Sequence, residues 1–344
     1  MALIRRLLLS LFGVLSLVAS LALAGCAGTG GATELADGRY ELKYQGTPGS
    51  VNLPELAEDL GYFDNIALNR VSDTSSGPIS IQNVATGETD FGSAFNGAIA
   101  KLRASGAKIT GVVDSYGADA ETYNGFLVKK DSDIHTGKDL IGKTIGMNTL
   151  GAHAEFITRE WLRQQGLTPE EIEKVNLVVV EPVNNEEALR SGQIDVGAVS
   201  GPFLQCAAAS GDFREIYTDK DLFDQFSYGS WIFRDNFIEK SPEAVADFTQ
   251  GVARAIRWLQ TTDRQTVIDR YKTIMAGRDR DEDPALAEYY RSSSIPKPGG
   301  VIQPEEFSIW TDWLVRNGEF HDDEVNPDDL FTNEFNPYAT GDLT

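Results

Sequence analysis

The chain has 344 residues, more than one typical hydrophobic core accommodates, so we expect two domains. Hydrophobic residues make up 41% of the sequence, which is ordinary for a globular protein and excludes a largely disordered chain. The formal net charge of −22 at pH 7 argues against nucleic acid and anionic lipid as partners, because like charges repel.

The first 25 residues predict a lipoprotein signal peptide. Arg5 and Arg6 precede an apolar run over 7–21, and Leu23-Ala24-Gly25-Cys26 places small residues before a cysteine, which resembles a bacterial lipobox. Cleavage there would make Cys26 the first mature residue and the site of lipid attachment. An ordinary secretory signal or an uncleaved anchor is the alternative. Residues 26–38, rich in Gly, Thr and Ala, predict a flexible tether.

Strand patterns then alternate with helix patterns along the chain. The predicted strands cover 40–44, 68–72, 109–115, 125–129, 143–147, 177–180 and 230–233. The predicted helices cover 53–60, 79–85, 97–105, 151–165, 184–190, 241–260, 263–275 and 305–317. This alternation predicts an α/β protein with largely parallel sheets.

One short sequence motif, which we call the repeated phrase, occurs twice. Residues 87–92 and 192–197 both contain Gly, Asp and Gly in the same register, and each follows a predicted helix. The first Gly of each copy is a helix stop, and a short apolar strand follows. We interpret the copies as equivalent strand entries of two lobes that face each other, with Asp90 and Asp195 in structural roles that bond local backbone amides.

The candidate ligand-binding residues follow the predicted strands, at helix starts. Ligands of α/β sheets bind beyond the carboxyl ends of the strands, where helix amides and hydroxyl groups donate hydrogen bonds. The candidates are Gln45, Ser50, Ser75, Ser76, Asn96, Tyr116, Thr149, His153, Ser200, Gly201 and Trp231.

Five of the candidates also have a purely structural interpretation. Ser75 and Ser76 would cap a helix, Asn96 would form a turn, His153 would lie on a helix surface, and Trp231 would belong to the core. The segments that hold the candidates contain no Lys, Arg, Asp or Glu. A singly charged sulfonate or carboxylate, or a neutral polar molecule, therefore fits better than a multiply charged phosphate. We find no metal-type Cys/His spacing, phosphate loop or nucleophile elbow, and so expect no cofactor, metal or catalytic residue.

Several motifs in order resemble a known family. They are the lipobox, Leu42-Lys43-Tyr44-Gln45, Gly61-Tyr62-Phe63, the two copies of the phrase, and Asp139-Leu140-Ile141-Gly142-Lys143. Together they resemble the substrate-binding lipoproteins of ABC importers, within them the aliphatic sulfonate, taurine, nitrate and thiamine-precursor group. The resemblance covers about residues 39–276.

The resemblance implies a two-lobed type II periplasmic-binding fold with a ligand cleft and two hinge crossings. Lobe one would comprise 39–126 and 227–344, and lobe two 127–226, with crossings near 124–126 and 226–229. The implied protein is a monomer, lipid-anchored on the cell membrane and facing the periplasm or the exterior, that passes a small solute to ABC permease subunits.

Two other functions stay open. The first is a ligand-binding sensor lipoprotein without transport. The second is an exported enzyme of the thiamine-pyrimidine type, although that family carries a cysteine-rich motif that this sequence lacks and is not exported.

Overall fold

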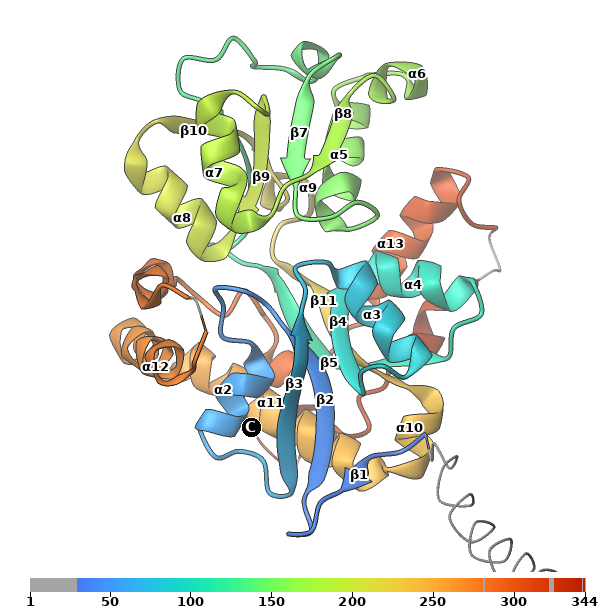
Figure 1. Ribbon diagram of the computed structural model, residues 1–344. Coiled ribbons are helices and arrows are strands. Elements are labelled where there is room, and N and C mark those ends of the chain that lie inside the picture. The colour runs from blue at the N-terminus through green and yellow to red at the C-terminus, as the bar shows by residue number, and fades with distance from the viewer. Residues whose placement is uncertain (1–29, 281, 322–324, 342, 344) are drawn as a thin grey trace, which may run out of the picture.

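The computed structural model describes residues 30–280, 282–321, 325–341 and 343. It has two lobes, joined by short connections over 119–123 and 219–225 (Figure 1). We call lobe one the part built on two three-stranded sheets, and lobe two the part built on the five-stranded sheet. The predicted signal peptide and Cys26 lie outside the described residues.

Two sheets form lobe one. The first contains, in order, β1 (Thr33–Glu34), β2 (Tyr40–Gly46) and β3 (Ile66–Asp73). The second contains, in order, β4 (Phe91–Phe95), β11 (Phe226–Arg234) and β5 (Ile109–Ala118). Alternate residues of β11 face opposite sides, so Trp231 and Phe233 pack with α11 while Ile232 packs with α13. The lobe is therefore covered by helices on both faces.

One sheet forms lobe two. Its strands, in order, are β10 (Phe213–Thr218), β6 (Asn124–Lys129), β9 (Val196–Ser200), β7 (Thr144–Met147) and β8 (Asn176–Val179). In β6, Phe126 and Val128 belong to the core cluster on one face, whereas Leu127 belongs to the cluster on the other. This strand is buried on both faces, as its continuous apolar sequence predicts.

Helices connect and cover the strands. Those of lobe one are α2 (Leu53–Asp59), α3 (Gly77–Thr86), α4 (Asn96–Ala104), α10 (Asp235–Lys240), α11 (Pro242–Thr261), α12 (Arg264–Gly277), α13 (Glu305–Arg316) and α14 (Pro337–Thr340). Those between β7 and β11 are α5 (His153–Gln164), α6 (Pro169–Ile172), α7 (Pro182–Ser191), α8 (Gly201–Ser210) and α9 (Lys220–Phe223). The 3₁₀ segments are η1 (Gly137–Leu140), η2 (Pro284–Tyr289), η3 (Pro298–Gly300) and η4 (Pro327–Asp329).

The repeated phrase has the same structure in both lobes. Gly87 ends α3 with φ 85° and Gly192 ends α7 with φ 79°, a left-handed conformation that favours glycine. Asp90 and Asp195 each accept a hydrogen bond from a neighbouring strand's amide, at 2.8 Å from Lys43 and 2.9 Å from Thr144. The structural role predicted for both aspartates is present, although the amides that they bind are distant in sequence.

The sheets are mixed rather than largely parallel. The pairs β2–β3, β7–β8 and β7–β9 are parallel, whereas β6 and β11 are antiparallel to both of their neighbours. These two strands follow the connections between the lobes. Each therefore enters its sheet against the direction of the βαβ units, and the prediction of largely parallel sheets was wrong for this reason.

Part of the predicted tether is attached to lobe one. Within it, Thr33–Glu34 pairs antiparallel with β2, and the amide of Ala32 donates to Ser241 Oγ at 2.9 Å. These short contacts fix the chain to lobe one from residue 32 onward, because even two strand residues satisfy backbone groups of the sheet edge.

Within the described residues, no helix combines the length and apolar character that a membrane span requires. The same residues contain no cluster of three or more His, Cys, Asp or Glu side chains that could hold a metal ion.

Candidate functional site: a cavity between the lobes

A cavity of about 450 Å³ lies between the two lobes. Its walls come from the loop after β2, the starts of α3, α5 and α8, the strands β5 and β11, and the segment that follows α12. None of its described lining residues is Lys, Arg, Asp or Glu. The cavity therefore offers hydrogen bonds and aromatic surface, but no formal charge unless a histidine is protonated.

The structure brings most of the predicted site residues together here. Those that line the cavity are Gln45, Ser50, Ser75, Ser76, Tyr116, His153, Ser200, Gly201 and Trp231. Thr149 does not line it, but its hydroxyl lies 2.9 Å from that of Ser76. Whether any of them contacts a ligand stays a prediction.

Asn96 lies outside the cavity. It is fully buried at the start of α4, where Nδ2 donates to the carbonyl of Glu306 at 3.0 Å and Oδ1 accepts from Ser230 at 2.8 Å. Both ends of its amide are thus used inside lobe one, which removes Asn96 from the candidate ligand contacts. Sequence position alone placed it at a strand end, and the core contacts were not visible there.

The lobes touch each other along one edge of the cavity, which we call the seam. Ser75 Oγ donates to Glu181 at 2.6 Å, and Asn148 Nδ2 donates to the carbonyl of Ser75 at 2.8 Å. Beside them lies the hydroxyl pair of Ser76 and Thr149. The seam joins the loop before α3 to the loops after β7 and β8, so the two lobes are in contact along this edge.

Some polar groups on the walls already have partners. Ser76 Oγ accepts from the Ile79 amide at 3.5 Å, as the capping alternative expects. Gln45 donates to Ser72 and accepts from Asn83, both at 3.0 Å. Ser200, in contrast, makes no capping hydrogen bond at the start of α8 and is exposed. Its hydroxyl is therefore better placed to bind a solute than the amide of Gln45.

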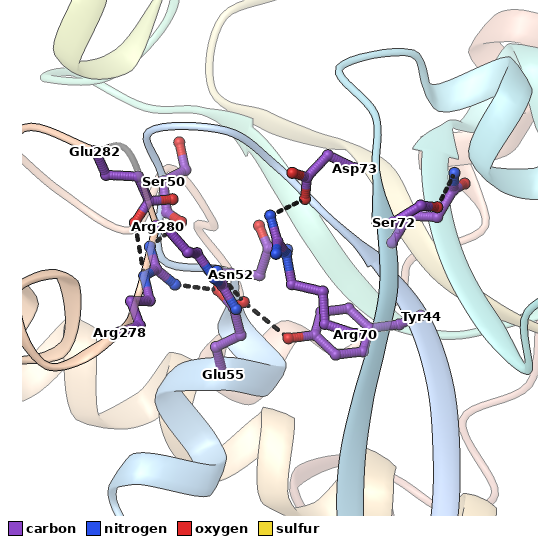
Figure 2. Close-up of polar contacts among 11 residues, drawn as sticks. Tyr44, Ser50, Asn52, Glu55, Arg70, Ser72, Asp73, Arg278, Arg280 and Glu282 are labelled. Carbon is purple, nitrogen blue, oxygen red and sulfur yellow. Dashed lines mark hydrogen bonds and ion pairs between the residues drawn. The ribbon is translucent and has the colours of Figure 1, made fainter.

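Ion pairs fix the loop that carries Ser50 (Figure 2). Glu55 accepts from Arg278 and Arg280, each at 2.8 Å, and Arg278 also donates to the carbonyl of Ser50 at 2.6 Å. Burial alone would raise the pKa of Glu55, but the Asn52 amide and the two guanidinium groups lower it. The carboxylate stays charged and holds this wall in place.

A hydrogen-bonded group lies where the chain crosses between lobes. Asp219 accepts from the Asn124 amide at 3.0 Å and pairs with His153 Nε2 at 2.9 Å, while Asn124 Nδ2 contacts the Tyr228 hydroxyl at 2.6 Å. The ring of Tyr228 stacks on that of His153 with centroids 3.6 Å apart. Burial lowers the pKa of His153, against the opposing effect of Asp219. We assign a neutral ring that donates through Nε2.

Four lining residues carry buried polar atoms with no partner among the described residues: His153 Nδ1, Ser115 Oγ, Trp231 Nε1 and the Tyr290 hydroxyl. Buried polar groups are normally hydrogen-bonded, so these four unpaired atoms are unusual for a protein interior.

Part of the cavity wall was not predicted from the sequence. The lining residues that were not among the candidates include Asn124, Tyr228, Tyr271, Met275, Leu286, Ala287, Tyr290, Ser292 and Ser293. Asn124 carried a signal, because it begins the strand that crosses between lobes. The apolar residues of α12 carried none, since a helix stripe that faces a cavity has the same spacing as one that faces a core.

Fold and cavity define a class: a two-lobed, mixed α/β binding fold with its site between the lobes. Solved structures share this fold. The chain is similar to the alkanesulfonate-binding protein SsuA from Xanthomonas axonopodis pv. citri bound to MOPS, with a TM-score of 0.66 and 18% identity over 88% of this chain and 99% of that chain. It is also similar to the periplasmic nitrate-binding protein NrtA from Synechocystis PCC 6803, with a TM-score of 0.67 and 12% identity over 88% and 89%.

The chain belongs to the NMT1/THI5-like family, whose model matches residues 55–264. A Brucella abortus (strain 2308) protein, described only as a candidate binding protein, is 25% identical over 211 residues, which cover 60% of this chain and 61% of that relative. The expected fold and family are therefore confirmed. Most of the similar structures are binding proteins, yet the desulfurization enzyme DszB shares the fold, with a TM-score of 0.58 and 16% identity over 88% and 99%.

Proposed function

We propose that the protein captures a small organic solute in the cavity between its lobes and delivers it to the membrane subunits of an ABC importer. The observation that carries this proposal is the cavity whose walls come from both lobes and whose described lining residues include no Lys, Arg, Asp or Glu. The family and the shared fold of sulfonate- and nitrate-binding proteins support it. In it, the two lobes close around the solute by bending at the connections 119–123 and 219–225.

The cavity chemistry favours a neutral polar or singly anionic solute. Hydroxyl groups and the amides at the starts of α3 and α8 donate hydrogen bonds that suit a sulfonate, a carboxylate or a nitrate-like group. A multiply charged anion would find no cation among the described lining residues to neutralise it. We therefore place such anions outside the substrate class.

Ligand screening tests this proposal. The panel for the purified full chain contains alkanesulfonates, taurine, nitrate, aromatic carboxylates and pyrimidines, measured by thermal shift and calorimetry. A true solute at 100 times its Kd adds about 2.7 kcal/mol to the free energy of unfolding.

A cavity-filling variant shows where the compound binds. Ser200→Trp places a large ring beside the cavity and should abolish binding. Ser210→Trp, at the far end of α8, should leave binding unchanged. The proposal is wrong if no compound in the panel stabilises the protein, or if Ser200→Trp binds as tightly as the unchanged chain.

We also propose that Cys26 carries a lipid that holds the protein on the outer side of the cell membrane. The lipobox at Leu23-Ala24-Gly25-Cys26 supports this. Cys26→Ser should release the protein into the soluble fraction or leave the precursor uncut, as membrane fractionation and mass spectrometry will show. A processed Cys26→Ser protein that stays in the membrane would contradict the anchor.

A further inference from the structure

One part of the cavity wall is apolar and comes from one part of the chain. Trp231 of β11 lines it together with six side chains from the end of α11, from α12 and from the segment that follows. These are Leu259, Tyr271, Met275, Leu286, Ala287 and Tyr290. We call these seven residues the apolar wall.

The apolar wall is a built surface rather than a loose flap. The rings of Tyr271 and Tyr290 meet edge to face with centroids 5.5 Å apart, and Trp231, Leu259 and Tyr290 belong to one buried cluster. Arg264 donates to the carbonyls of Tyr290 at 2.7 Å and Glu288 at 2.8 Å, which fixes this segment to α12.

Most of the apolar wall lies outside the family match. That match ends at residue 264, whereas Tyr271, Met275, Leu286, Ala287 and Tyr290 all come later. The polar edge at Ser75 and Ser76 lies inside it. The family match therefore covers the polar edge but leaves out most of the apolar wall.

Two polar atoms interrupt the apolar wall. Trp231 Nε1, which can only donate, and the Tyr290 hydroxyl are both buried without a partner among the described residues. Both residues are less than a tenth exposed, Trp231 at 6% and Tyr290 at 8%. Both polar atoms are covered, so the surface that the wall offers to a bound molecule consists of its apolar side-chain atoms.

We infer that the apolar wall binds a second part of the solute: a group of the size of a phenyl ring or a branched alkyl chain. This rests on the proposed function and narrows it to amphipathic organic solutes. A cavity of about 450 Å³ is in the range that encloses organic molecules, and an inorganic anion such as nitrate would fill little of it.

Matched pairs of compounds test this inference by calorimetry on the full chain. The pairs share a head group and differ in the apolar group: methanesulfonate and benzenesulfonate, acetate and phenylacetate, acetamide and phenylacetamide. In at least one pair, the aromatic member should bind at least tenfold more tightly.

Equal or tighter binding of the small members in every pair that binds overturns the inference and leaves the proposed function standing. Absence of binding by all six compounds, together with no response to the wider panel, overturns the proposed function and the inference with it.

Two variants assign the effect to the apolar wall. Leu286→Asn keeps the side-chain size but adds an amide, so it should weaken the aromatic member about tenfold and change the small member less than twofold. Leu286→Met is its control. Leu286 is only half-buried, which makes a folding defect avoidable.

Trp231→Phe replaces the indole with a smaller ring and removes part of the apolar contact surface, so it should weaken binding of the aromatic member several-fold. Trp258→Phe is the control, because Trp258 packs against the same buried cluster without lining the cavity. If Leu286→Asn and Trp231→Phe both bind the aromatic member as the unchanged chain does, the apolar wall does not hold it.

Discussion

Single residues set the polarity of the cavity. His153 is neutral because burial lowers its pKa, and its Nε2–H donates a hydrogen bond to Asp219. The hydroxyl of Ser200 lines the cavity and makes no capping hydrogen bond, so it remains available to a solute. An acceptor oxygen on the solute would satisfy this donor.

Another titratable pair lies behind the cavity wall. Asp114 of β5 is fully buried and Glu306 of α13 is 6% exposed. Burial is the main cause that raises the pKa of Asp114, and it raises that of Glu306 to about 7. The two carboxyl groups repel each other when both are charged, which raises the pKa of Asp114 further.

This pair predicts a pH dependence of stability. A carboxyl whose pKa is raised by folding binds more protons in the folded state, so the free energy of unfolding falls as pH rises from about 4.5 to about 7. Glu306→Gln keeps the capping acceptor for the Gln303 amide and removes the charge. We expect it to raise stability at pH 8 by about 1–2 kcal/mol and to flatten this decline.

Denaturant unfolding between pH 4 and pH 9 measures this effect. The control is Glu305→Gln, because Glu305 is exposed one residue earlier on the same helix. A Glu306→Gln protein that keeps the full decline, or that is less stable at pH 8, would show that the pair is not a source of the pH dependence.

Elements were more predictable than sites. The spacing of apolar residues located most strands and helices, because one buried face imposes period 2 or 3.6 locally. The strand Phe213–Thr218 was missed, since its Arg214 and Glu215 break the apolar pattern at a sheet edge. Strand direction was not predictable either, because β6 and β11 are reversed by the path of the chain between lobes, which no local window records.

The repeated phrase predicted equivalent elements, but it did not predict the site. Gly87 and Gly192 end equivalent helices, and Asp90 and Asp195 hold equivalent strands. The residues just after each copy diverge: Asn96 is used in the core, while Ser200 lines the cavity. The backbone is thus similar after the two copies, but the roles of the side chains differ. These roles depend on contacts with distant segments such as α13.

At the scale of the whole molecule, the seam favours the closed arrangement. Its cross-cleft bonds are few and partly exposed, so each contributes about 0.5–1.5 kcal/mol at most. A cluster of aromatic rings elsewhere between the lobes adds to this contact. In it, the ring of Phe156 of α5 packs against the rings of Phe95 and Trp313 of lobe one, with centroids 4.9 and 4.4 Å apart. A few substitutions at the seam should therefore shift the equilibrium between open and closed forms.

A double variant tests the seam. Asn148→Ala with Glu181→Ala removes two cross-cleft partners of Ser75 and should increase the radius of gyration of the ligand-free protein in small-angle X-ray scattering. It should also weaken a compound that binds the unchanged chain about tenfold. Glu181→Gln alone keeps an acceptor and is the control. Unchanged scattering and affinity in the double variant would contradict a closing role for the seam.

The order of strands in lobe one has a consequence for how the chain acquires its shape. β11 lies between β4 and β5, yet it is the last of the three to emerge from a ribosome or a translocation pore. Until residues 226–234 are available, β4 and β5 have no strand between them. All five strands of lobe two fall between Asn124 and Thr218, so that lobe is complete earlier. We expect lobe two to fold first. Lobe one would be completed later, when β11 inserts between β4 and β5.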